Sequence, residues 1–81
     1  MKIRVQFFSH LKDIVRASEV QVEVEEGTTA GALLDQLYSQ YARLRDWDST
    51  ILIGAGVEFV ERDHVLRCAE EISIMPPVQG G

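Results

Sequence analysis

Alternating apolar and polar residues mark three segments of the sequence as half-buried β-strands. The segments are residues 2–7, 20–24 and 72–75. Their inward positions are expected to be Ile3, Val5, Phe7, Val20, Val22, Val24, Ile72 and Ile74. We expect Gly27 to end the second strand, and Pro76-Pro77 to end the third, because proline has no N–H to donate to a sheet.

A helical period in the apolar residues predicts one main helix between residues 30 and 41. Thr28 and Thr29 are candidates for its N-cap. Its apolar face contains Ala30, Leu33, Leu34, Leu37, Tyr38 and Tyr41, which is wide enough to cover one side of a sheet. A shorter helix over residues 11–15 is expected to begin at Ser9 as its cap.

Two apolar runs around a glycine-containing turn predict a hairpin in the second half of the chain. The runs are residues 51–53 and 57–60, and the turn is Gly54-Ala55-Gly56. Leu66 is expected in the core. The order of elements predicts an α+β domain with a sheet covered on one face by one main helix.

Composition limits the classes of protein that fit this pattern. The 81 residues suffice for a single core, and 46% hydrophobic with 26% charged residues is ordinary for a globular domain. No apolar run approaches the ~20 residues that span a bilayer. The single cysteine, Cys68, fits a reducing compartment. We therefore expect a cytoplasmic protein that does not associate with a membrane.

The net charge of −5 bears on the partners. Nucleic-acid binding depends on Lys and Arg that neutralise phosphates, so the acidic balance argues against a nucleic-acid partner. It is compatible with docking onto a basic protein surface. The alternative is that mild acidity only keeps a small protein in solution.

No set of residues in the folded part of the sequence resembles a catalytic or metal site. His10, His64 and Cys68 match no spacing of metal ligands. The carboxylates of Glu25-Glu26 and Glu70-Glu71 are expected in solvated turns. No glycine-rich loop precedes a helix, so no nucleotide site is indicated. We expect no metal, no bound cofactor and no active site of the chain's own.

The end of the sequence is more informative. Pro76-Pro77 predicts a stiff exit from a domain of residues 1–77, followed by a flexible tail of residues 78–81. Four extended residues span at most about 13–14 Å. Gly80 and Gly81 have no side chains, so this tail could enter a narrow cleft and deliver its terminal carboxylate. The alternative is a frayed end whose glycines have no role.

This ending resembles that of the small subunits of molybdopterin synthase, a family of ubiquitin-like sulfur carriers with the β-grasp fold. The specific part is Pro76-Pro77-Val78-Gln79-Gly80-Gly81. Residues 5–9 and residues 63–66, which lead into the last strand, match the family as well. The chain departs from it at Gly56, where the family often has Asn, and at Ala69-Glu70, where it often has Gly-Asp.

The resemblance implies a mechanism in which partners act on the end of this chain. A ubiquitin-activating-type enzyme would use ATP to adenylate Gly81, and a persulfide donor would convert the adenylate into a thiocarboxylate. The tail, narrowed by Gly80, would then enter the large subunit of molybdopterin synthase in a heterotetramer. There it would give its sulfur to cyclic pyranopterin monophosphate, in molybdenum cofactor biosynthesis.

Strand alternation also predicts part of a docking surface. If Phe7 and Ile74 point inward, Phe8 and Met75 point outward next to the tail. Phe59 matches a family position in the same patch, but alternation leaves its direction open, and core packing is the alternative. The expected partner-binding residues are Phe8, Phe59, Met75, Pro76, Pro77, Val78 and Gln79.

Other functions share these features. The chain could carry sulfur for thiamine, cysteine or tRNA thiolation, and it could be a ubiquitin-like modifier that is joined to lysines. A plain interaction domain is the third alternative.

Overall fold

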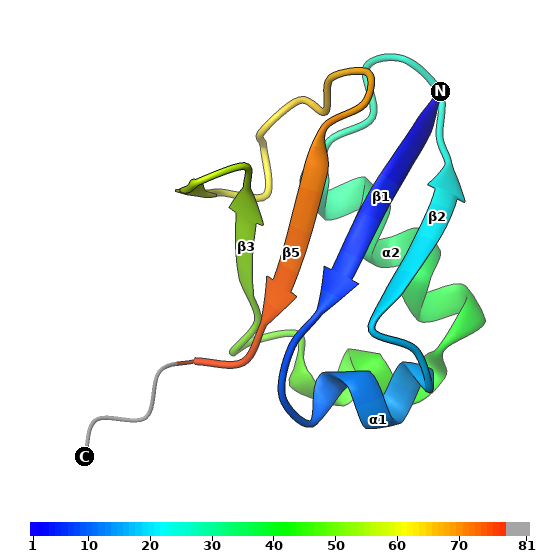
Figure 1. Cartoon of the computed structure of the whole chain (residues 1–81), viewed down its shortest axis with the longest axis vertical. Coiled ribbons are helices and arrows are strands. Elements are labelled where there is room, and N and C mark those ends of the chain that lie inside the picture. Colours follow the sequence, from blue (N-terminus) through cyan, green and yellow to red (C-terminus); the bar gives the residue numbers. More distant parts are fainter. Residues whose placement is uncertain (78–81) are drawn as a thin grey trace.

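The computed structural model describes residues 1–77, which form one mixed sheet with helices on one side (Figure 1). The strands are β1 (Lys2–Phe7), β2 (Glu19–Glu23), β3 (Leu52–Ala55), β4 (Glu58–Val60) and β5 (Glu71–Met75). The helices are α1 (Leu11–Val15), α2 (Ala30–Gln40) and a 3-10 helix, η1 (Ala42–Trp47). Within residues 1–77, no helix has both the length and the apolar character needed to cross a membrane.

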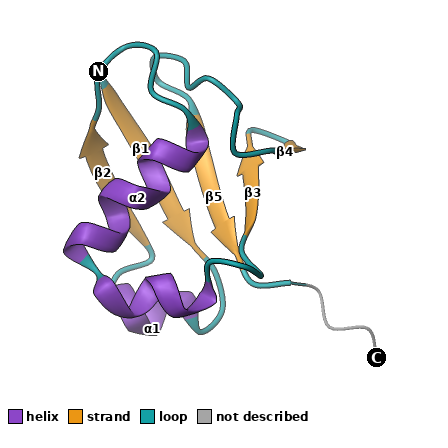
Figure 2. Cartoon of the chain, turned by 180° about the vertical axis from the view of Figure 1, so that it is seen from behind, coloured by secondary structure: helices purple, strands orange, loops and turns teal. Residues whose placement is uncertain are grey.

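The strand order is β2-β1-β5-β3-β4, so the first and last strands lie side by side in the sheet. β1 and β5 are parallel, and every other pair of neighbouring strands is antiparallel. Figure 2 shows α2 lying across one face of the sheet. We call the opposite face, turned away from α2, the outer face. The predicted α+β arrangement with one main covering helix is confirmed.

The core lies between the sheet and α2. The register pairs Val5 with Ile72, and Phe7 with Ile74, which places these four side chains on the face toward the helix. Val20, which was also expected to point inward, is only half-buried and packs against the core. The other residues expected in the core are buried, among them Ile3, Val5, Phe7, Val22, Leu33, Leu37, Ile53, Leu66, Ile72 and Ile74. The period of two in the strands and the helical period in α2 therefore identified the correct faces.

The N-terminus of α2 is held by its own cap and by the loop before β5. The Thr29 side chain accepts a hydrogen bond from the Ala32 amide at 3.1 Å, which confirms Thr29 as the cap. The Gly31 amide donates to the Arg62 carbonyl at 2.9 Å. A Cβ on Gly31 would lie 3.2 Å from the Arg62 Cβ, so glycine allows this close approach of loop and helix.

The prediction that Ser9 caps α1 is wrong. Ser9 has a left-handed backbone with φ 52°, and the N-cap position is His10, whose side chain makes no capping bond. Backbone carbonyls satisfy the first turn instead: the Leu11 amide donates to Phe8, and the Lys12 amide donates to Ser9. A hydroxyl acceptor is therefore not needed there.

The hairpin is confirmed, but its turn lies later than expected. Gly54 and Ala55 belong to β3, where they pair with Phe59 and Glu58. The turn is centred on Gly56, whose φ of 63° is a conformation that glycine adopts without steric cost. A single left-handed glycine thus reverses the chain, and Gly54 remains free for a role in the sheet.

The other differences between the predicted and the observed elements lie at the end of α2 and directly after it. α2 ends at Gln40, so Tyr41 is its C-cap residue rather than part of its apolar face. The mostly polar residues that follow form η1, an element that the sequence pattern does not predict, with Leu44 fully buried. A single buried leucine in a 3-10 helix of six residues gives too little periodicity to be recognised from the sequence.

Both departures from the family pattern coincide with left-handed backbone. Gly56 has φ 63°, and Asn, the residue frequent in the family, also tolerates this region. Ala69 also has φ 63°, in the position where the family often has Gly. Its Cβ makes that conformation cost roughly 1–2 kcal/mol. Glu70 next to it accepts hydrogen bonds from the Arg67 amide and lies 3.1 Å from His64 Nε2.

A polar cluster joins α2, the end of η1 and the loop after β4. The Tyr38 hydroxyl donates to Asp48 Oδ1 at 2.5 Å, and Arg62 donates to the same oxygen at 2.9 Å. The hydrogen bond from Tyr38 lowers the pKa of Asp48, and the charge of Arg62 lowers it further. Burial is the larger of two causes that raise the pKa of Tyr38, and the hydrogen bond to Asp48 is the second.

This cluster predicts a pH dependence of stability. Because the pKa of Asp48 is lower in the folded state, its contribution is present above the unfolded-state pKa of about 3.9 and is lost as the pH falls below it. We expect Asp48→Asn to lower the unfolding midpoint at neutral pH, and the difference from wild type to shrink below about pH 4. Thermal denaturation from neutral to acidic pH measures this. Asp46→Asn, at an exposed position, is the control, and an equally large effect there would contradict the assignment.

Candidate functional site

Pro76 and Pro77 follow β5 at the end of the sheet where β1 and β5 both stop (Figure 1), and we call this place the tail exit. Because β1 and β5 are parallel, the residues that follow these two strands lie at the same end of the sheet. The Phe8 amide donates to the Ile74 carbonyl at 3.1 Å, which places Phe8 beside the end of β5. Met75 is the last residue of that strand, and Pro76 and Pro77 follow it half-buried.

Large apolar side chains are exposed around this exit. Phe8 is 42% exposed and Met75 is half-buried, while Phe7 and Ile74 are buried, so the predicted outward direction of Phe8 and Met75 is confirmed. Phe59 is 69% exposed, so the alternative that it packs in the core is wrong. We call Phe8, Phe59 and Met75 the apolar patch.

A shallow groove of about 200 Å³ lies on the outer face beside the tail exit. The register pairs Gly54 with Phe59 on one side and with Ser73 on the other, so these residues share the outer face. The groove is lined by Gly54, Gly56, Val57, Glu58, Phe59, Ser73 and Met75. We call it the tail-side groove, since Met75 leads directly into Pro76.

The sequence did not identify Gly54, Ser73 or Val57 as parts of this surface. The sequence pattern predicts Gly54 in the turn of the hairpin, and it does not predict the pairing of β3 with β5. Val57 is fully exposed at the tip of the hairpin. A signal was present in Gly54 itself, because glycine inside a strand often marks a close approach by another group.

Four of the predicted site residues lie outside the described residues: Val78, Gln79, Gly80 and Gly81. The expectation that Gly80 and Gly81 are exposed and poorly ordered, and the flexible tail of residues 78–81, therefore stay predictions. Within residues 1–77, the apolar patch and the tail-side groove share Met75, which directly precedes Pro76 and Pro77.

Of the three residues considered for conventional chemistry, His10 and His64 have local partners. The rings of His10 and Trp47 are 4.3 Å apart, so α1 and η1 meet through them. His64 Nε2 lies 3.1 and 3.2 Å from the two carboxylate oxygens of Glu70. Cys68 is an exposed free thiol. Among residues 1–77, no group of three or more His, Cys, Asp or Glu side chains is placed to hold a metal ion.

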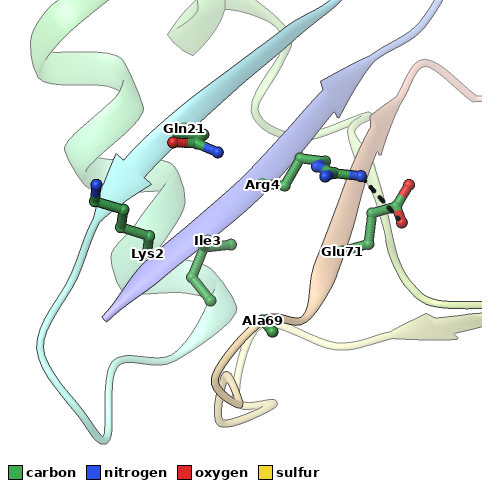
Figure 3. A pocket seen from close by; sticks show the side chains of 6 residues that line it. All are labelled: Lys2, Ile3, Arg4, Gln21, Ala69 and Glu71. Atoms are coloured by element: carbon green, nitrogen blue, oxygen red, sulfur yellow. Dashed lines mark ion pairs between the residues drawn. The ribbon is translucent and has the colours of Figure 1, made fainter.

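A second hollow lies at the opposite end of β5, around its first residue (Figure 3). Arg4 lies across it and pairs with Glu71 at 3.9 Å and with Glu19 at 3.7 Å. Both pairs are about half exposed, and such pairs contribute at most about 1 kcal/mol. Since the strand separates this hollow from the tail exit, it takes no part in the candidate site.

Comparison with known sequences matches this chain to a family and to curated relatives. The sequence pattern of the ThiS family matches residues 5–81, which includes the glycine ending. The molybdopterin synthase sulfur carrier subunit of Mycobacterium tuberculosis is 30% identical over 82 residues, covering 100% of this chain and 99% of that protein.

Solved structures show the same fold. SAMP1, a small archaeal modifier protein from Haloferax volcanii, has a TM-score of 0.86 at 24% identity, with 100% of both chains covered. The complex of subunits 1 and 2 of the molybdopterin-converting factor from Helicobacter pylori includes a chain with a TM-score of 0.72 at 21% identity, again with 100% of both chains covered. The ubiquitin-like β-grasp fold expected from the resemblance is confirmed.

Proposed function

The chain belongs to the ThiS family of sulfur carriers, and from that premise we propose that it is the sulfur carrier subunit of a molybdopterin synthase. The observation that carries this proposal is the match of the family to residues 5–81, which include the terminal glycine. The apolar patch, exposed where the tail begins, supports it. In this proposal Gly81 reacts, Gly80 keeps the end of the tail narrow, and the folded domain docks on the partners.

Activation is necessary because a carboxylate is a poor electrophile. The Gly81 carboxylate attacks the α-phosphate of ATP on a ubiquitin-activating-type enzyme, and pyrophosphate leaves. The terminal sulfur of a persulfide donor then attacks the carbonyl, and AMP leaves. A thiol cleaves the remaining sulfur–sulfur bond, which leaves a thiocarboxylate on Gly81. The catalytic groups belong to the partners, and ATP is bound by the activating enzyme.

The thiocarboxylate is then delivered to the large subunit of molybdopterin synthase, where it gives its sulfur to cyclic pyranopterin monophosphate. The solved Helicobacter pylori complex, named for two subunits of a molybdopterin-converting factor, supports a two-subunit assembly. A heterotetramer in the cytoplasm is the state that we propose. Acidic Glu58 on the groove and the net charge of −5 favour a partner with basic groups around its cleft.

A second candidate function is protein modification. The similarity to SAMP1, which is named a modifier, favours it. A modifier would share the adenylated terminus, but it would end in an isopeptide bond to a lysine instead of transferring sulfur.

Intact mass spectrometry tests the proposal. We expect that incubating the full chain with its activating enzyme, ATP and a persulfide donor raises its mass by one sulfur-for-oxygen exchange. Adding the large subunit and cyclic pyranopterin monophosphate should return the mass to that of the carboxylate. A stable adduct to lysine with no sulfur gain would support the modifier function. Sulfur gain without transfer to the pyranopterin would place the carrier in another pathway.

A further inference from the structure

We propose that Gly54 is a specificity-determining position of the docking surface, because it lets the side chain of Met75 lie across the sheet and so keeps the tail-side groove open. The inference rests on the proposed function, in which the protein that receives the tail covers this surface. Gly54 acts through Met75, so it is a positioning residue and not part of the chemistry.

The contacts around Gly54 carry the inference. A Cβ built on Gly54 would lie 3.2 Å from the Met75 Cε and 3.5 Å from the Ser73 Cβ. The first distance is tighter than an ordinary van der Waals contact, whereas the second is ordinary. The terminal methyl of Met75 therefore occupies the space that a side chain at position 54 would need.

A side chain at position 54 would change the surface more than the stability. The atom in its way is the far end of a flexible side chain, which can rotate to another rotamer at low cost. Gly54 has no positive φ, so L-residues fit its backbone. The Met75 methyl would have to shift by a few tenths of an ångström, or rotate away, and either change alters the wall of the groove that Met75 lines. We therefore expect a side chain at position 54 to preserve the fold and to change the shape of the groove.

The reach of the tail identifies what covers the groove. The four residues after Pro77 span at most about 14 Å when extended. The protein that takes up the Gly81 carboxylate must therefore come close to the end of β5, where the half-buried Met75 and the exposed Phe59 line the groove. The occupant that we infer is an apolar side chain of the large synthase subunit, which enters the groove between Phe59 and Met75 and packs on the Met75 methyl.

The experiment is a double-mutant cycle on the full chain, with the affinity for the large subunit measured by calorimetry. We expect Gly54→Ala to weaken binding by about tenfold, with a nearly unchanged thermal midpoint. Met75→Leu removes the terminal methyl, so Gly54→Ala should weaken binding much less in that background. Additive effects of the two substitutions would overturn the role of Gly54, as would unchanged affinity of Gly54→Ala.

Gly31→Ala is the matched control, because its Cβ would also meet a neighbour at 3.2 Å, but on the helix side. It should leave the affinity unchanged, and an equal loss there would show that Gly54→Ala acts through general loosening. Met75→Lys separates the two hypotheses. If Met75→Lys weakens binding and Gly54→Ala does not, only the role of Gly54 is overturned. If the large subunit binds Met75→Lys as tightly as wild type, the docking surface of the proposed function is wrong as well.

Discussion

Deleting Gly81, or adding one residue after it, abolishes thiocarboxylate formation while leaving thermal stability nearly unchanged; this is the largest effect that we expect. The activating enzyme docks on the folded domain, so its reacting atoms lie at a fixed depth along the tail. One residue moves the carboxylate by about 3.3–3.6 Å. A misplacement of ~1 Å at a reacting centre can cost about a hundredfold in rate.

Two measurements check this result. The sulfur gain is followed by intact mass with the activating enzyme, ATP and the persulfide donor, and the unfolding midpoint is followed by circular dichroism. Asp35→Asn, at an exposed position of α2, is the control, because it leaves the tail and its length unchanged. If the shortened chain gains sulfur at the normal rate, the carrier mechanism is wrong.

Leu37→Ala produces the largest loss of stability that we expect. Leu37 is 1% exposed on the face of α2 that packs on the sheet. Truncating a buried leucine removes its burial and leaves a cavity, which together cost about 2–5 kcal/mol. Since the free energy of unfolding of a small domain is about 5–15 kcal/mol, this is a large share.

Denaturant titration of the wild type, Leu37→Ala and Leu52→Ala measures the loss. Leu52 is half-buried in β3, at the pair position of Met75 on the outer face, so the same substitution there should cost much less. A negligible shift of the midpoint for Leu37→Ala would mean that the buried face of α2 is assigned wrongly.

The elements that the sequence predicted well are those in which many residues repeat one period. Three alternating inward residues define β1, and the stripe of α2 continues over three turns, so one face of each must be buried. The failures are short and local. The cap of α1 is made by backbone carbonyls, and the turn of the hairpin depends on one positive φ at Gly56, neither of which leaves a periodic pattern.

The candidate site also has a part that the sequence predicts and a part that it does not. Phe8 follows β1 and Met75 ends β5, and both strands alternate clearly, so the outward direction of these two side chains could be predicted. Phe59 lies in β4, which has three residues at the edge of the sheet, and its direction depends on the pairing with Gly54. That pairing is a long-range property of the fold. For the same reason the groove, which needs β3 beside β5, could not be predicted.

The pairing of β1 with β5 has a consequence for how the protein is made. Residues 2 and 75 belong to neighbouring strands, with β5 between β1 and β3. During translation, β1 can pair with β5 only after β5 has been synthesised, so the middle of the sheet forms late. Pairings between residues far apart in the sequence are also slow to form. A nascent chain released before Glu71 lacks the strand that joins the two halves of the sheet. Cells would therefore meet such fragments as unfolded chains with exposed apolar segments, which are substrates for chaperones and proteases.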